Sequence, residues 1–405
     1  MFANTKNWHR VILWLLVIKV GYLAVIYSAV KLWSDFDEEK FREITARWFP
    51  DVNKGGPVFA SHFGTWDGAH YLYLSEVGYV QGVKSCAFYP LWPLTIRWFS
   101  ILTGGSHVAS GMVLANVFSL GAWTIFYQVT SRRFGQSVAL WALVFLIVFP
   151  GSLFYQFTYS EPLFFLLVML LWLGLEQERY GLAWLAAFLL PLTRGVGVFG
   201  VLPIGWHWLM KQPWAWLDQW PLLDAERQRR RTDSVSGTAN VRWPGVLLLA
   251  QVLGWAVYLG LMCVWTDNPW EGIQAQRFWG VHSITNLVDL PKFVVGLFTP
   301  TQFHDFRGSM LDRCLFILLL YTLPLVWRLG KDLMVWTYVL GILPAMSGTF
   351  TSLTRYESTV FPMFIALAVF FTSRKQTWPL VVFIIFSAAL HAILLWRFVN
   401  FRWAG

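Results

Sequence analysis

The chain has 405 residues, of which 57% are hydrophobic, 18% aromatic and only 13% charged. Soluble globular proteins carry about 25% charged residues, so this composition excludes an ordinary soluble domain. The net charge of +9 does not indicate a nucleic-acid partner, because the basic residues lie in short loops where they set membrane topology. No set of His and carboxylate residues has ligand spacing and no Cys pair has metal spacing, so no divalent metal and no cofactor are indicated, and metal dependence stays open.

Apolar segments of about 17–25 residues, the length that crosses a bilayer as a helix, recur along the chain. They predict an all-α polytopic membrane protein with a single transmembrane domain over residues 1–405, about eleven spans and an inside N-terminus. The predicted spans are Val11–Trp33, Val108–Val129, Val138–Phe154, Pro162–Leu175, two short helices within Leu182–Leu209, Gly245–Trp265, Leu311–Trp327, Leu333–Phe350, Val360–Phe371 and Pro379–Trp396.

Three polar regions separate these spans. Residues 34–107 form the predicted first external loop, with amphipathic interfacial helices at Ser34–Arg47 and Leu91–Leu102. Residues 211–244 form a basic cytoplasmic loop, and residues 267–310 form a second external region. A single span over residues 182–209 would place the basic loop outside. We therefore predict two short helices that meet near Arg194 and bring that residue to the outer side, although one span stays an alternative. Irregular backbone at this depth is tolerated where it lines a cavity.

Unusual polar residues gather at the external ends of these spans. Ionisable groups inside a membrane cost about 2.5–3.5 kcal/mol on insertion scales, so a cluster on one side predicts a functional cavity. Guanidinium groups there suit a phosphate-bearing ligand, and a carboxylate suits the general base for an attacking hydroxyl. We expect the acid that follows Trp66 to meet the late arginines in one pocket. The candidates are Asp67 and Glu161 as catalytic residues, with Arg355, Arg194, Arg277, Gln276, His70, Tyr356 and Trp66 as substrate-binding residues.

Each candidate also has a structural interpretation. Asp67 fits the N-cap of a helix starting at Gly68, and Glu161 fits a cap for the helix that follows it. Arg194 and Arg355 fit residues that extend to the membrane interface. Asp35 and Asp37 form a DxD pattern, but the charged residues after them favour a solvated surface helix.

Several motifs, in order along the chain, resemble one enzyme family. They are WDGAHYL (residues 66–72), GY (78–79), AFYPLWP (87–93), YSEPLF (159–164), LTRG (192–195), and TRY (354–356) followed by FP (361–362). The first block is the most specific. Together they resemble the family of GPI mannosyltransferase II (PIG-V type).

This resemblance implies a GT-C-like bundle and a glycosyltransferase that takes a hexose from a polyprenyl-phosphate-sugar donor. It implies an external active site whose key acid lies in the first external loop, at the position of Asp67. The acceptor would be a lipid or cell-surface hydroxyl, attacked with inversion. The membrane would be a bacterial plasma membrane, or the endoplasmic reticulum with a lumenal site. Acceptor identity, the sugar and the oligomeric state stay open.

Two other functions fit the composition. A transporter of polyisoprenoid phosphate or lipid-linked sugar would use the same arginines for the phosphate but would need no base. The absence of an internal repeat and the long first loop argue against it. A structural membrane subunit would not need charges clustered on one side.

Overall fold

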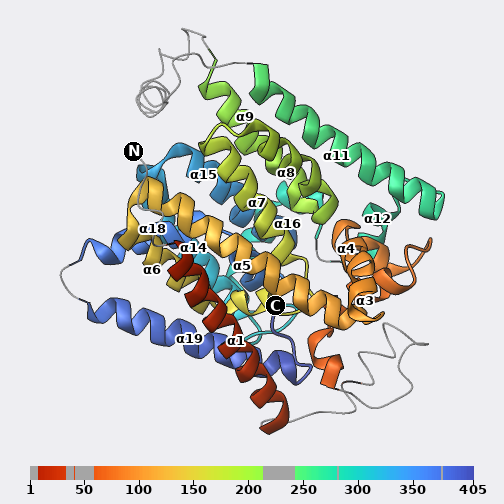
Figure 1. The fold of residues 1–405 in the computed structure, drawn as a ribbon, viewed down its shortest axis with the longest axis horizontal. Helices are drawn as coiled ribbons and strands as arrows, with labels where there is room; N and C mark the ends of the chain where they lie inside the picture. The colour runs from red at the N-terminus through yellow and green to blue at the C-terminus, as the bar shows by residue number, and fades with distance from the viewer. Residues whose placement is uncertain (1–7, 33–40, 42–58, 213–241, 281, 375–376) are drawn as a thin grey trace.

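The computed structural model describes residues 8–32, 41, 59–212, 242–280, 282–374 and 377–405. Within these ranges the regular structure is helical, apart from an isolated β-bridge between Gln302 and Ser309, so the all-α prediction is confirmed (Figure 1). The helices, with η for short 3₁₀ or π turns, are α1 (Trp8–Leu32), η2 (Phe59–Phe63), α3 (Asp67–Glu76), η3 (Lys84–Ala87), α4 (Leu91–Ser100), η4 (Ile101–Thr103), α5 (His107–Phe134), α6 (Gln136–Val148), η5 (Pro150–Tyr155), α7 (Glu161–Glu176), α8 (Tyr180–Thr193), η6 (Gly195–Gly200), α9 (Val201–Met210), α11 (Arg242–Thr266), α12 (Glu271–Gln274), η8 (Ala275–Phe278), η9 (Ile284–Leu287), α13 (Leu290–Phe298), α14 (Met310–Leu329), α15 (Lys331–Thr337), η10 (Tyr338–Ile342), α16 (Leu343–Gly348), α17 (Leu353–Glu357), α18 (Phe361–Thr372) and α19 (Trp378–Val399).

Five of these helices are long and apolar enough to cross a membrane, as expected for an integral membrane protein. Others are shorter: at about 1.5 Å per residue, a helix such as α6 falls short of a bilayer core of about 30 Å. The count of about eleven spans therefore stays a prediction. The five long segments are His9–Leu32, His107–Phe134, Gly245–Thr266, Met310–Leu329 and Trp378–Val399.

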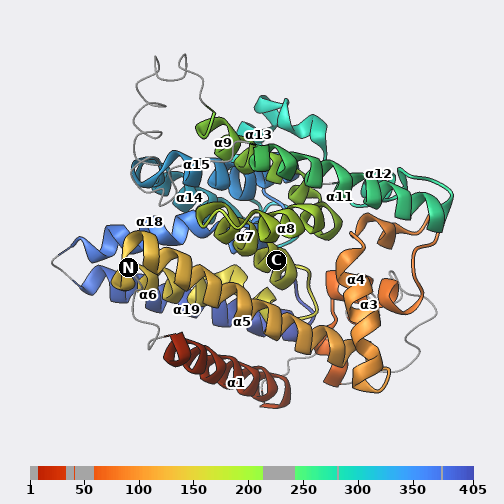
Figure 2. The same ribbon diagram turned by 45° about the horizontal axis from the view of Figure 1, so that its top comes forward.

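Helix α7 lies at the centre of the bundle. Its sequence is apolar on all sides, a pattern typical of a helix buried all round, and nearly every one of its residues is buried. Helices α5 and α8 pack against it, α11 packs on α8, and α1 and α19 lie together on the opposite flank (Figures 1 and 2). The short helices α3 and α4 lie together at one end of the bundle. The N-terminal end of α7 faces the site described below.

The predicted break in residues 182–209 occurs at Arg194. Helix α8 ends at Thr193, and Arg194 adopts an extended backbone before the chain turns into η6 and then α9. Gly197 allows this turn, because a Cβ there would lie 2.2 Å from the carbonyl oxygen of Leu190 in α8. The break leaves the Arg194 side chain at the end of a helix that contacts α7.

The structure describes parts of the predicted first external loop. Helix α4 and η4 occupy the predicted helix at Leu91–Leu102, with Trp92 buried and Trp98 and Leu102 exposed. This one-sided pattern fits an interfacial helix, whose depth in a membrane stays a prediction. Most of the predicted helix at 34–47, with Asp35 and Asp37, and most of the basic loop at 211–244 lie outside the described residues.

Two segments that lead into the site have left-handed backbone at non-glycine residues. Trp66, directly before α3, has φ 55°, and Thr349, Phe350 and Ser352, just before α17, have φ 48°, 69° and 58°. Such conformations cost about 1–3 kcal/mol each and persist only where the surrounding structure enforces them. Helix α17 is held closely against η5, since a Cβ on Gly151 would lie 1.9 Å from the Thr354 carbonyl oxygen. The segments directly before α3 and α17 therefore have backbone conformations that the surrounding structure holds in place.

Candidate active site

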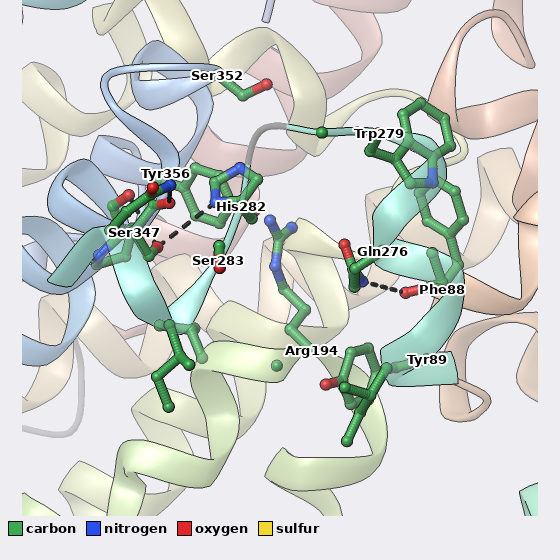
Figure 3. A pocket seen from close by; sticks show the side chains of 18 of the residues that line it. Phe88, Tyr89, Arg194, Gln276, Trp279, His282, Ser283, Ser347, Ser352 and Tyr356 are labelled. Atoms are coloured by element: carbon green, nitrogen blue, oxygen red, sulfur yellow. Dashed lines mark hydrogen bonds between the residues drawn. The ribbon is translucent and has the colours of Figure 1, made fainter. Parts of the chain in front are cut away.

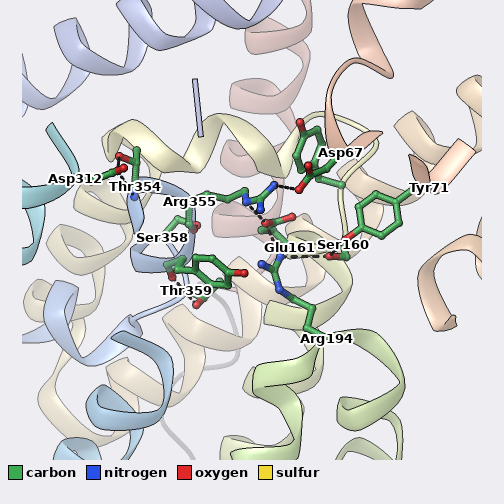
Figure 4. A network of polar contacts seen from close by, with 12 residues as sticks. Asp67, Tyr71, Ser160, Glu161, Arg194, Asp312, Thr354, Arg355, Ser358 and Thr359 are labelled. Atoms are coloured by element: carbon green, nitrogen blue, oxygen red, sulfur yellow. Dashed lines mark hydrogen bonds and ion pairs between the residues drawn. The ribbon is translucent and has the colours of Figure 1, made fainter. Parts of the chain in front are cut away.

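Four charged side chains from four distant segments meet at the N-terminal end of α7. Asp67 begins α3, Glu161 begins α7, Arg194 follows α8, and Arg355 lies in α17. Arg355 pairs through Nη1 with Asp67 Oδ2, and its Nε lies 3.0 Å from Glu161 Oε1. Arg194 Nη1 pairs with the same Glu161 oxygen (Figure 4). One carboxylate thus joins two guanidinium groups, and a second carboxylate joins only Arg355.

Glu161 is the buried centre of this network. Its side chain has no solvent exposure, whereas that of Asp67 is 13% exposed. The position of Glu161 in the first turn of α7 favours a negative charge, because the helix dipole is positive there. Burial acts to lower the pKa of Arg355, but Asp67 and Glu161 outweigh it and raise that pKa well above its usual range. Arg355 therefore stays charged.

Neutral polar and aromatic groups fix the two arginines. Ser160 Oγ lies 3.3 Å from Arg194 Nη1 and shares a 2.7 Å hydrogen bond with the hydroxyl of Tyr71. The Tyr356 ring lies against the Arg194 guanidinium, whose Cζ is 4.7 Å from the centroid of the ring. The His282 ring packs edge-on against Tyr356 with centroids 5.5 Å apart, and burial, Arg355 and Arg194 lower its imidazole pKa to about 4. His282 is neutral at pH 7, and the two arginines supply the positive charge.

A cavity of about 890 Å³ opens beside this network (Figure 3). That volume lies in the range of ligand sites, about 300–1,000 Å³. Asp67, Arg194 and Arg355 form part of its wall, and residues 273–306, within the predicted second external region, supply much of the rest. Gln276 ties that region to the first loop, because its Nε2 donates a 2.9 Å hydrogen bond to the carbonyl of Ala87. The cavity thus lies between the two external regions predicted from the sequence.

The sequence model of the mannosyltransferase (PIG-V) family matches residues 11–229, which is more than half of the chain. The chain belongs to this mannosyltransferase (PIG-V) family. The predicted family and enzyme class, a membrane glycosyltransferase, are therefore confirmed. None of the curated proteins matches the sequence.

Two solved structures share a distant likeness with this PIG-V family member. One is ArnT from Cupriavidus metallidurans bound to undecaprenyl phosphate, with 14% identity, a TM-score of 0.47, and coverage of 94% of this chain and 64% of that one. The other is the Archaeoglobus fulgidus oligosaccharyltransferase tethered to an acceptor peptide, with 16% identity, a TM-score of 0.43, and coverage of 99% and 56%. The chain therefore spans roughly three fifths of their lengths.

The structure brings six of the nine predicted site residues to the cavity wall. Three do not line it. Glu161 lies behind the arginines, fully buried. His70 is buried because its Nδ1 shares a 2.7 Å hydrogen bond with Ser85 Oγ and its ring stacks on Phe88. Trp66 packs edge-on against Trp403, with ring centroids 5.2 Å apart. The six lining residues are Asp67, Arg194, Gln276, Arg277, Arg355 and Tyr356.

Sequence reasoning missed several residues of this PIG-V site. The aromatic part of the wall includes Phe88, Tyr89 and Trp403. The cationic part includes Lys292, which no motif contains. A signal for Lys292 was present, because it is the sole lysine of residues 267–310 and lies at the start of an apolar stretch, LPKFVVGLF.

The polar groups of the site hold no recognisable metal-ligand set. Among the described residues, no three His, Cys, Asp or Glu side chains lie together in a way that would hold a metal ion. The charged groups that can act on a ligand here are carboxylates, guanidinium groups and one ammonium.

Proposed function

We propose that this enzyme transfers a hexose, mannose in the first instance, from a polyprenyl-phosphate-sugar donor to a hydroxyl of a lipid or cell-surface acceptor. The family supports the sugar. The cationic cavity of a membrane protein supports a donor with a phosphate and a hydrocarbon chain.

A single observation carries this proposal: Asp67 is paired and yet still open to the cavity. Its Oδ2 is bound by Arg355, while its Oδ1 accepts no hydrogen bond from the described residues. A carboxylate held in one orientation, with one oxygen free toward a ligand cavity, suits a general base. The pairing with Arg355 fixes the carboxylate, and the free Oδ1 is the atom that would take the proton.

The reaction proceeds in one displacement. Asp67 Oδ1 accepts the proton of the acceptor hydroxyl, whose oxygen forms a bond to the anomeric carbon. The bond from that carbon to the donor phosphate oxygen breaks on the opposite face, and the polyprenyl phosphate leaves with the electron pair. Attack and departure on opposite faces invert the anomeric configuration. Cationic donors that face the departing phosphate lower the barrier, since charge develops there in the transition state.

Glu161 has a different role from the one expected of a catalytic carboxylate. It is fully buried and touches both arginines, so we assign it to holding Arg194 and Arg355 in place. Arg355 Nη1 and Nε face carboxylates, and Nη2 has no partner within the ranges that the structure describes. Nη2 is thus the Arg355 donor that remains for the ligand.

The test is transfer of labelled mannose from polyprenyl-phosphate-mannose to membrane lipids by the purified full-length protein. We expect Asp67→Asn to lower kcat by about 10²–10⁴-fold, the usual contribution of a general base. Glu76→Gln, at the other end of the same helix and outside the cavity wall, is the control and should transfer normally. Wild-type turnover by Asp67→Asn would remove Asp67 from this role. Movement of the donor across vesicles without any transfer would instead identify a transporter.

A further inference from the structure

Lys292 projects from α13 into the same cavity. Its Nζ donates a 2.7 Å hydrogen bond to Asn286 Oδ1, and Asn286 Nδ2 donates a 2.7 Å hydrogen bond to the carbonyl of Ser347 in α16. Asn286, Ser347 and Lys292 all line the cavity. The ammonium is therefore held at the wall by a neutral acceptor, with its full charge available to a ligand.

The cavity has an excess of positive charge on this side. Among the described residues its wall carries four cationic side chains, Arg194, Arg277, Lys292 and Arg355, against the single carboxylate of Asp67. Asp67 and the underlying Glu161 balance Arg194 and Arg355 through ion pairs. Arg277 and Lys292 form no ion pair with any described carboxylate. Two cations at a cavity wall that pair with no carboxylate of the described ranges attract an anion such as a phosphate.

Helix α13 continues from the cavity as an open apolar surface. One side of the helix is anchored, because the Phe293 ring stacks on Phe350 with centroids 4.7 Å apart. The other side is exposed, and α13 lies on the outside of the bundle (Figure 2). Ile284 in the preceding turn both lines the cavity and is 75% exposed, so the apolar surface begins at the cavity rim. The exposed apolar residues are Ile284, Val288, Leu290, Val294, Val295 and Phe298.

We propose that Lys292 and the apolar face of α13 form the lipid side of the donor site. The Lys292 ammonium binds the phosphate of a polyisoprenyl phosphate, and the hydrocarbon chain lies along Val294, Val295 and Phe298. This inference rests on the proposed function and names the residues that recognise its lipid substrate. Its support is the continuity of cation, cavity rim and exposed apolar helix in one segment of a membrane protein.

The test measures binding rather than turnover. The probes are a long-chain polyisoprenyl phosphate without sugar and inorganic phosphate, added to the full-length protein in detergent micelles. Lys292→Ala should weaken binding of the long-chain lipid by about tenfold, and Lys292→Arg should restore most of it. Lys331→Ala is the matched control, because Lys331 also lies in the first turn of a helix but not in the cavity, and its affinity should be unchanged.

A second variant tests the apolar surface. Val294→Ser with Val295→Ser removes exposed methyl groups without touching the core, so the protein should fold normally. It should weaken binding of the long-chain lipid but leave a short-chain isoprenyl phosphate unaffected. Equal affinity of wild type and Lys292→Ala for the long-chain lipid would overturn the proposal. So would an equal loss for inorganic phosphate, which would indicate a site for free anions. Because this assay measures binding without turnover, its outcome does not depend on the chemistry proposed for Asp67, and failure of that chemistry is recognised separately in the transfer assay.

Discussion

Each end of α7 carries a cluster of ion pairs between arginines and carboxylates, but the ratio of arginines to carboxylates is reversed between the two ends. At the N-terminal end, one buried glutamate, Glu161, joins two arginines. At the C-terminal end, one arginine, Arg133, joins two carboxylates: its Nη1 lies 3.0 Å from Glu176, and Asp332 binds it through two hydrogen bonds of 2.6 and 2.8 Å. The first cluster adjoins a cavity of about 890 Å³, whereas the hollow lined by Glu176 and Asp332 has about 10 Å³.

This difference separates a binding site from a structural clasp. A hollow of about 10 Å³ holds at most one water, so the hollow beside Glu176 and Asp332 has no room for a ligand. Arg133 is bound through Nη1 and Nη2 to carboxylates that link α5, α7 and α15. At the other end, Asp67 and Arg355 are only partly engaged and face open space. An ion-pair cluster indicates function when donors or acceptors remain free toward a cavity.

Among variants that compare the two ends of α7, the largest effect should come from Arg355→Lys. Lysine keeps the charge but loses the planar fork that reaches Asp67 and Glu161 at once. We expect kcat for sugar transfer to fall by about 10²–10³-fold, as when a preorganised donor is removed from an active site. The measurement is single-turnover transfer from the lipid-linked donor.

Arg133→Lys is the matched control for that variant, because it makes the same change in an arginine that also binds two carboxylates. It should leave kcat within about twofold of wild type. Equal losses of kcat in the two lysine variants would mean that the two ends of α7 do not differ in function.

Glu161→Gln should have the next largest effect. Loss of one partner from a buried ion pair costs about 3–5 kcal/mol, because the remaining charges are left without compensation. Here two guanidinium groups lose their shared carboxylate, so we expect lower thermal stability together with a drop in kcat. Glu161→Asp, which keeps the charge, should recover part of both. A stable and fully active Glu161→Gln protein would show that this carboxylate does not position the arginines.

Several charged residues of the site could be predicted from the sequence, because they lie in recognisable short motifs. Asp67 and Arg355 lie in short motifs at the ends of apolar segments. Charged side chains within a membrane are costly, so their presence at the ends of these segments indicates a functional site. The break at Arg194 follows from Pro191, Gly195 and Gly197 together with the charge of the next loop.

The remaining features depend on three-dimensional packing that no local pattern encodes. Glu161 and Asp67 have similar sequence contexts, and only the packing of α7 in the centre of the bundle makes one inaccessible. The polar imidazole of His70 predicts that it binds substrate, but its ring stacks on Phe88 in a buried aromatic cluster. Lys292 enters the site because Asn286 is bound to α16, a contact between segments 61 residues apart.

A smaller effect is expected at Asp312, which holds α17 in place without facing the cavity. Its Oδ1 accepts hydrogen bonds from the backbone N–H of Thr354, at 2.8 Å, and from the Thr354 hydroxyl. Asp312→Leu removes this acceptor and should cost about 1–3 kcal/mol of stability, the penalty for unsatisfied buried donors. It should also lower kcat about tenfold, because Arg355 follows Thr354 directly.

Asp312→Asn retains an acceptor oxygen and should behave nearly as wild type in both measurements. If Asn were as damaging as Leu, charge rather than the hydrogen bonds to Thr354 would be the contribution of this residue.

The smallest effect on activity should come from Arg133→Gln, which breaks the clasp at the other end of α7. The Arg133 and Asp332 side chains are 14% and 8% exposed, so their hydrogen bonds are largely shielded from water and outweigh those of a surface ion pair. We expect thermal unfolding to shift down by an amount equivalent to about 1–3 kcal/mol, while kcat measured below the unfolding transition stays unchanged. A loss of kcat at full stability would mean that the cluster at Glu176 communicates with the cavity through α7. An unchanged kcat would mean that α7 isolates the chemistry at its N-terminal end from the ion pairs that fasten its C-terminal end.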